Sequence, residues 1–183
     1  MSIGMKRGTV YLESHRLEWE TAAAETIRVI KNVLGSTAID VRHIGSTSVR
    51  SIPAKPIIDI AVGIDDYEAV LLKRDVLEEE NIIFRFDERP EQLLFVMGDF
   101  GKDTRTHHIH VVKYGSEEWE NYLNFSDYLN ENTAAAERYA ALKTALAEKY
   151  PNDRIAYTNG KSELIGELLE KARKWRESKE QTS

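Results

Sequence analysis

At 183 residues, with 42% hydrophobic and 31% charged residues, the chain is typical of one soluble globular domain. The absence of cysteine excludes disulfides, a thiol nucleophile and cysteine-ligated zinc. The chain has no apolar signal segment and no run of ~20 apolar residues, so we expect a cytoplasmic protein with no membrane contact. The net charge of −6 argues against a nucleic-acid polymer as partner, because such binders usually carry a basic surplus, but it is compatible with a nucleotide or another phosphorylated small molecule.

The first third of the chain predicts a strand-like segment, a helix and a strand. Residues 9–12 form the strand-like entry, and Ser14 is placed to cap a helix that ends at Gly35. Apolar residues of this helix recur at spacings of three and four and should face the core: Trp19, Ala23, Ile27, Ile30 and Leu34. Residues 39–44 alternate as a strand does, and they lead into the small-residue turn Gly45-Ser46-Thr47-Ser48.

The middle third predicts the rest of a mixed sheet. Residues 57–64 are almost wholly apolar and β-branched, which is typical of a strand buried on both faces. Asp65 and Asp66 are placed to start a helix over residues 67–80. Three further strands are predicted at residues 82–86, 93–97 and 106–113.

The last third is helical. Ser116 is placed to cap a helix through Leu129, and a second helix stops at Pro151. The inward residues expected of these helices and of a final one are Trp119, Tyr122, Leu129, Tyr139, Leu142, Leu146, Ile165, Leu168, Ala172 and Trp175. Residues 177–183 are polar and should fray. The prediction is therefore one α+β (mixed α/β) domain over residues 1–183, with its sheet in about 9–113 and a helical part in about 116–178.

Asp59 stands out because it lies within an apolar strand. Burying an ionised carboxylate is costly unless it is paired, hydrogen-bonded or bound to a cation, so such groups often mark functional sites. The alternative is a structural aspartate near a strand end that holds a neighbouring turn. The turn at Gly45-Ser46 adds a second candidate, since backbone N–H groups and the hydroxyls of Ser46 and Thr47 can bind phosphate. Alone this turn is a weak signal, because such turns are common.

Three of the five histidines, His107, His108 and His110, lie within four residues. On a strand, His108 and His110 share one face while His107 points to the other. Two imidazoles on one face can bind a metal ion, with Asp59 as third ligand if the strands are neighbours. The alternative is a hydrogen-bonded polar strand edge or a base that positions a ligand.

Lys143 and Lys161 lie on the apolar sides of their helices and so point toward the protein body. Either could pair with phosphate oxygens, as could Arg105, although such lysines more often extend to the surface.

These features together resemble the GrpB (glutamate-rich protein) family from about residue 9 to 175. The motifs that carry the resemblance are His43-Ile44-Gly45-Ser46-Thr47-Ser48-Val49, Ala54-Lys55-Pro56-Ile57-Ile58-Asp59-Ile60, His107-His108-Ile109-His110-Val111-Val112, Trp119 ahead of Phe125 and Asp127-Tyr128-Leu129, Tyr139-Ala140-Ala141-Leu142-Lys143, and Tyr157 with Lys161.

That family is similar to the nucleotidyltransferase superfamily. The resemblance implies a mixed β-sheet flanked by helices with a C-terminal helical tail, phosphates near Gly45 and Ser46, and a divalent metal near Asp59. Further ligand-binding positions expected on this basis are His43, Thr47, Lys55, Lys143, Tyr157 and Lys161.

The chain departs from the superfamily at the second acid, which falls at Ala61. Asp59 with His108 and His110 would be a softer site than an all-oxygen Mg²⁺ site, and the expected cofactor is a divalent metal such as Mg²⁺, Mn²⁺ or Zn²⁺. Relative to the family pattern, Arg50-Ser51 replaces a Pro-Gly and Ser126 replaces an arginine.

The leading hypothesis is a metal-dependent nucleotidyltransferase acting on a small-molecule or protein acceptor, with Asp59, His108 and His110 as catalytic and metal-binding residues. Two alternatives stay open: a non-catalytic domain that binds a nucleotide or phosphorylated ligand in a degenerate site, and a metal-dependent phosphoester hydrolase.

Overall fold

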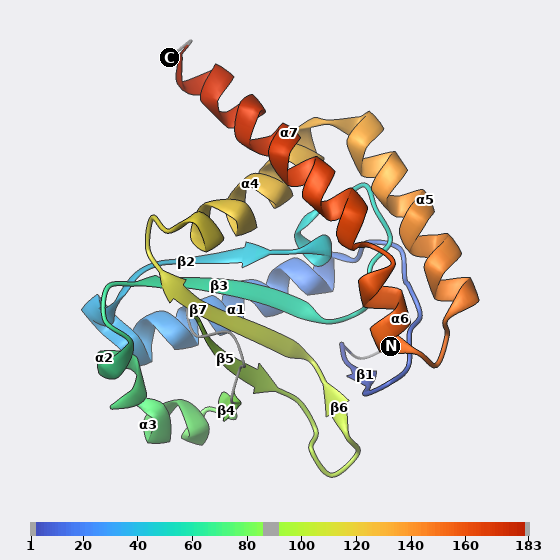
Figure 1. The fold of residues 1–183 in the computed structure, drawn as a ribbon. Coiled ribbons are helices and arrows are strands. Elements are labelled where there is room, and N and C mark those ends of the chain that lie inside the picture. The colour runs from blue at the N-terminus through green and yellow to red at the C-terminus, as the bar shows by residue number, and fades with distance from the viewer. Residues whose placement is uncertain (1–2, 86–91, 182–183) are drawn as a thin grey trace.

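The structure, a computed structural model, describes residues 3–85 and 92–181. In chain order its elements are β1 (Met5–Lys6), α1 (Leu17–Leu34), η1 (Gly35–Thr37), β2 (Ala38–Ile44), η2 (Ser46–Ser48), β3 (Ile58–Ile64), α2 (Tyr67–Leu71), α3 (Arg74–Glu79), β4 (Ile83–Arg85), β5 (Gln92–Met97), β6 (Thr104–Arg105), β7 (His107–Lys113), α4 (Glu117–Glu131), α5 (Thr133–Lys149), α6 (Arg154–Asn159) and α7 (Ser162–Glu180) (Figure 1).

Within the described residues, five strands form one mixed sheet in the order β2-β3-β7-β5-β4. Strands β3 and β7 run parallel at the centre, and the other neighbouring pairs are antiparallel. The register places Asp59 opposite His108 and Ala61 opposite His110. Residues at matched positions of neighbouring strands point to the same face. The α+β fold with a mixed sheet and a helical C-terminal part, predicted from the sequence, is therefore confirmed.

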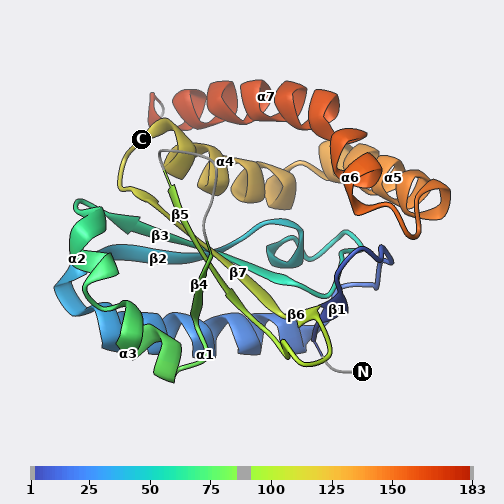
Figure 2. The ribbon, with the colours of Figure 1, turned by 60° about the horizontal axis from the view of Figure 1, so that its bottom comes forward.

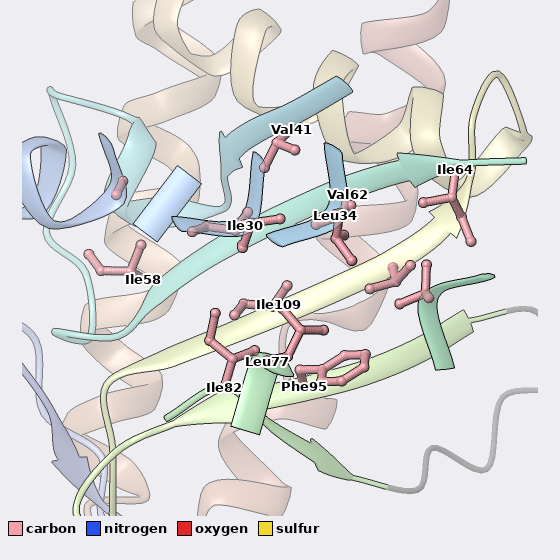
Figure 3. Close-up of a cluster of buried hydrophobic side chains, with 14 of the residues drawn as sticks. Ile30, Leu34, Val41, Ile58, Val62, Ile64, Leu77, Ile82, Phe95 and Ile109 are labelled. Atoms are coloured by element: carbon pink, nitrogen blue, oxygen red, sulfur yellow. The ribbon is translucent and has the colours of Figure 1, made fainter. Parts of the chain in front are cut away.

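Helices cover both faces of this sheet. Figure 2 shows α1, α2 and α3 on one face and α4 to α7 on the other. The larger core lies between α1 and the sheet, where Ile30 and Leu34 pack against Val62 and Ile109 (Figure 3). On the opposite face Trp119 of α4 packs on the sheet in a smaller core. The C-terminal helices share a third core with Val49 and Ile52 of the segment before β3, which fixes these helices over the end of the sheet where β3 begins.

Most predicted elements are found, and local capping explains several of their boundaries. Asp66 and Ser116 cap α2 and α4, since their side chains accept hydrogen bonds from the N–H groups of Glu68 and Trp119. Gly35 is the C-cap of α1, as predicted. No helix in the described part of the chain is both long and apolar enough to cross a membrane.

Four predicted boundaries are wrong. Residues 9–12 are not a strand, since the first strand, β1, precedes them and pairs with β6. Ser14 does not cap α1, which starts at Leu17 after Arg16. The helix expected over residues 67–80 is two short helices, and α7 continues through Glu180 instead of fraying from residue 177. The predicted end of β4 at Phe86 lies outside the described residues.

Candidate functional site

A cavity of about 250 Å³ lies between the start of β3 and the C-terminal helices. Its lining combines predicted site residues from four separate parts of the chain. They are Gly45, Ser46, Lys55, Asp59, His108, Lys143, Tyr157 and Lys161. The fold brings them together because η2 follows β2, β3 and β7 are neighbouring strands, and α5 to α7 pack over that end of the sheet.

Asp59 lies beside both predicted imidazoles. Its Oδ1 atom is 3.2 Å from His108 Nδ1 and 3.7 Å from His110 Nε2. Burial by itself would raise the pKa of Asp59, but the hydrogen bonds and charge of the two histidines outweigh it and hold the pKa far below its usual value. The side chain keeps 30% of its exposure at the cavity. Asp59 is thus an ionised carboxylate at the cavity wall, with the His108 and His110 rings beside it.

The turn after β2 packs directly against this carboxylate. Gly45 has φ 71° and ψ −168°, and a Cβ atom there would lie 2.7 Å from Asp59 Oδ2, so only glycine fits. The Gly45 N–H donates to Ser126 Oγ at 3.0 Å, and Ser48 Oγ donates to the Gly45 carbonyl at 2.7 Å. The Gly45 N–H is thus already bonded, and Ser46 is the next residue of the turn that lines the cavity.

His43 and Thr47, expected to bind ligand, lie behind the turn and do not line this cavity. His43 Nε2 is 2.9 Å from Thr47 Oγ1, and the Thr47 residue is 1% exposed. Burial lowers the pKa of His43 to about 4, so its ring is neutral at pH 7. The pair therefore supports the turn from below. His43 also lines a separate cavity of about 320 Å³ beside α1 and α4.

Three lysine side chains lie against two tyrosine rings in the cavity. Lys143 is 1% exposed, donates to the Pro53 carbonyl at 2.6 Å and lies 4.8 Å from the centre of the Tyr139 ring. The Nζ atoms of Lys161 and Lys55 lie 4.5 and 5.3 Å from the centre of the Tyr157 ring.

Arg154 of α6 completes the cationic lining. Among residues 3–85 and 92–181, none of these four cations has a carboxylate within 4 Å.

Burial and mutual repulsion weaken the hold of these lysines on their protons. Burial, with added repulsion from Lys161 and Lys55, lowers the pKa of Lys143 to about 7. Burial and the charge of Lys55 lower the pKa of Lys161 to about 8. Burial and Arg154 lower the pKa of Lys55 as well. A cluster of buried and partly buried cations without carboxylate partners within ion-pair range is electrostatically unfavourable, and a bound anion would stabilise it.

Two further parts of the lining were missed in the sequence. Arg154 and Thr158 lie on α6, a helix too short for a clear apolar period, although Asp153 after Pro151 could have marked its start. Arg105 lies outside the cavity lining. His107 faces the opposite side of the sheet, as alternation predicts, with its Nε2 atom 3.3 Å from Thr26 Oγ1.

The donors around Asp59 do not form a ready metal centre. In the described part of the chain no group of three or more His, Cys, Asp or Glu side chains is arranged to hold a metal ion. Ala61, opposite His110, supplies no second carboxylate. The donor set fits one carboxylate contact to an ion whose other ligands come from phosphate and water, which is a common arrangement for Mg²⁺.

Comparison with known proteins places this geometry in a family. The sequence profile of the GrpB protein family matches residues 9–171. The chain belongs to the GrpB family. It is similar to the glutamate-rich protein GrpB of Alkalihalophilus pseudofirmus, with 34% identity over 170 residues that cover 91% of this chain and 98% of that protein.

Solved structures agree with this assignment. A crystal structure of the conserved protein GrpB from Enterococcus faecalis is similar to the chain with a TM-score of 0.84 and 29% identity, covering 91% of this chain and 99% of that one. The structure of a cytoplasmic RNA terminal U-transferase is similar with a TM-score of 0.52 and 15% identity, covering 75% of this chain and 41% of that one. The second likeness shows that this GrpB-family chain has a nucleotidyltransferase-like fold.

Proposed function

We propose that this GrpB-family protein binds a nucleoside triphosphate, or a similar polyphosphorylated small molecule, and transfers its nucleotidyl group to an acceptor. The observation that carries the proposal is the group of cations Lys55, Lys143, Lys161 and Arg154, which lack carboxylate partners among the described residues and share one cavity with Asp59. Four positive charges against one carboxylate suit a ligand with several negative charges.

Each part of the cavity has a role in this reaction. The lysines would bind the β- and γ-phosphates and stabilise the pyrophosphate as it leaves. Ser46, which lines the cavity with Asp59, would hold a phosphate there. The acceptor hydroxyl would bond to the α-phosphorus as the bond to the β-phosphate oxygen breaks, and its proton would pass to solvent or to a nearby base. Positioning and charge neutralisation are the main protein contributions in such transfers.

A divalent ion delivered with the triphosphate would find Asp59 as its protein carboxylate. Such an ion supplies Lewis-acid polarisation of the α-phosphate and lowers the pKa of the attacking hydroxyl. His108 and His110 are near enough to join it or to keep Asp59 oriented when it is absent.

A second candidate function, binding without transfer, is favoured by Ala61. This residue stands where the nucleotidyltransferase superfamily has a second acid, and its methyl group cannot hold a metal ion. The cations of the cavity serve equally well in this case, since they bind phosphate without taking part in bond breaking.

The test combines ligand binding with a chemical readout. Thermal unfolding is measured with inorganic tripolyphosphate and with each nucleoside triphosphate, in EDTA, Mg²⁺ or Mn²⁺, because a ligand of the native state raises Tm by mass action. Lys161→Ala should weaken binding about tenfold or more, as expected for a partly buried charge-assisted contact. Lys149→Ala, an exposed lysine on α5, is the matched control and should leave binding unchanged.

Pyrophosphate release then separates the two candidates. Pyrophosphate release when a cell extract is added as a source of acceptor supports nucleotidyl transfer. Tight nucleotide binding without pyrophosphate release supports the second candidate, binding without transfer. The proposal fails if neither tripolyphosphate nor any triphosphate raises Tm, or if the rise is the same in Lys161→Ala.

A further inference from the structure

A second cationic cluster lies outside the cavity, around the loop that joins β5 to β6. Arg85 and Arg105 lie 5.0 and 4.7 Å from the centre of the ring of Phe100, which belongs to this loop. Arg7, which follows β1, is 3.9 Å from Asp103, and Arg105 is 3.7 Å from the same carboxylate. The backbone fixes this arrangement, because Met5 pairs with Arg105 and the Arg7 N–H donates to the Asp103 carbonyl at 3.0 Å.

This cluster adjoins the cavity through Arg154. Figure 2 shows the segment that follows β1 rising toward α6, which starts at Arg154. The Val10 N–H donates to the Pro151 carbonyl at 2.8 Å and so ties the segment after β1 to the approach of α6. Burial lowers the pKa of Arg105, and the charges of Arg7, Arg85 and Arg154 lower it further while Asp103 opposes the shift.

The concentration of charge is unusual for this protein. The chain as a whole has a net charge of −6, but at this place positive charges outnumber negative ones. Among the described residues, Arg7 and Arg105 share one carboxylate in ion-pair range, that of Asp103. Arg7 keeps 60% of its side-chain exposure, and Arg85 is also exposed. Guanidinium groups match the oxygens of phosphate in pairs, so the exposed side of the cluster is suited to phosphate groups.

We propose that Arg7, Arg85 and Arg105 form a second phosphate-binding subsite at the mouth of the cavity, joined to the first through Arg154. It would hold either the distal phosphates of a long ligand or the phosphate of a separate small-molecule acceptor. The proposal rests on the proposed function, because it treats the cavity as the site of the first phosphates.

The test uses inorganic phosphate chains of defined length. Binding of tripolyphosphate, which the cavity should hold, is compared by calorimetry with binding of a longer linear polyphosphate. A second arm titrates inorganic phosphate into protein saturated with tripolyphosphate. The variant is Arg7→Ala/Arg85→Ala, which changes two exposed residues outside the cavity lining. The control is Arg28→Ala/Arg74→Ala, which removes the same charge on α1 and α3.

We expect the wild type to bind the longer chain about fivefold more tightly than tripolyphosphate, or to bind added phosphate about fivefold more tightly than the Arg7→Ala/Arg85→Ala variant does. The variant should lose this gain in affinity, which is the size expected for about two exposed charge contacts. Tripolyphosphate should bind that variant about as well as it binds the wild type.

A gain with chain length alone assigns the subsite to distal phosphates, and binding of added phosphate assigns it to an acceptor. The inference is overturned if neither arm shows a gain, if the gain survives in the variant, or if the control loses it equally. It is also overturned if a short single-stranded oligonucleotide binds more tightly than polyphosphate through the same arginines. Loss of tripolyphosphate binding in Lys161→Ala tests the cavity separately.

Discussion

Replacing Lys143 with methionine should make the protein more stable while it abolishes tight phosphate binding. The Lys143 amine is 1% exposed, and its pKa falls from 10.5 to about 7 because burial disfavours the charged form. Its partner is the Pro53 carbonyl, and no carboxylate lies within ion-pair range among the described residues. Keeping Lys143 protonated in its buried position therefore lowers the free energy of unfolding.

The size of the effect follows from that pKa. Below pH about 7 the folded and unfolded states are both protonated at Lys143, and the difference between 10.5 and about 7 sets an upper limit of about 5 kcal/mol on the cost of the buried charge. Leaving the Pro53 carbonyl without its donor costs about 1–3 kcal/mol. The net expected gain for Lys143→Met near pH 7 is therefore about 2 kcal/mol.

Urea denaturation of both proteins from pH 6 to 10.5 measures this difference. Between about 7 and 10.5 the unfolded state binds more protons at Lys143 than the folded state, so wild-type stability should rise with pH relative to the variant. Lys149→Met, at an exposed position of the same helix, should show neither the gain nor the pH dependence. A Lys143→Met protein that is less stable than wild type at pH 7 would refute the reasoning.

Three further predictions concern the cavity. Tripolyphosphate affinity should fall as pH rises from 6 to 9, because Lys143 and Lys161, with pKa values of about 7 and about 8, lose the protons that bind phosphate; calorimetry in buffers of different ionisation enthalpy should detect proton uptake on binding at pH 8. Gly45→Ala should lower the free energy of unfolding by about 3 kcal/mol through its backbone conformation and its overlap with Asp59, whereas Gly166→Ala, on open helix surface, should raise it by about 0.5–1 kcal/mol; urea denaturation measures both. Asp59→Asn should remove any Mg²⁺- or Mn²⁺-dependent part of the Tm rise with nucleotide but preserve metal-free tripolyphosphate binding, and an unchanged metal response would count against Asp59 as the ion's carboxylate.

Local pattern sufficed for much of the fold. The apolar period of residues 19–34 and the β-branched run at 57–64 record which side chains must leave water, and each pattern fits one kind of backbone. The patterns failed where hydrogen bonding decided the outcome. The two-residue strands β1 and β6 exist only because they pair with each other, and their sequences carry no alternation that could reveal them.

The candidate site divides in the same way. Asp59 was detectable because a carboxylate in an apolar strand conflicts with its surroundings, and strand alternation was enough to separate His107 from His108 and His110. The expected ligand roles of Lys55 and Tyr157 came from family resemblance, since nothing in their own neighbourhoods predicts a shared cavity.

By itself, then, the sequence determined which segments are helices and central strands and which carboxylate is out of place, because those properties depend on neighbours along the chain. It takes the folded chain to show that Asp59 lies opposite His108, that Thr47 and His43 support the turn from behind, and that lysines from three segments meet in one cavity with Asp59 as its carboxylate. Those facts depend on strand order and helix packing, which bring together residues far apart in sequence. The electrostatic cost of that meeting, on which the proposed anionic ligand rests, exists only in the folded protein.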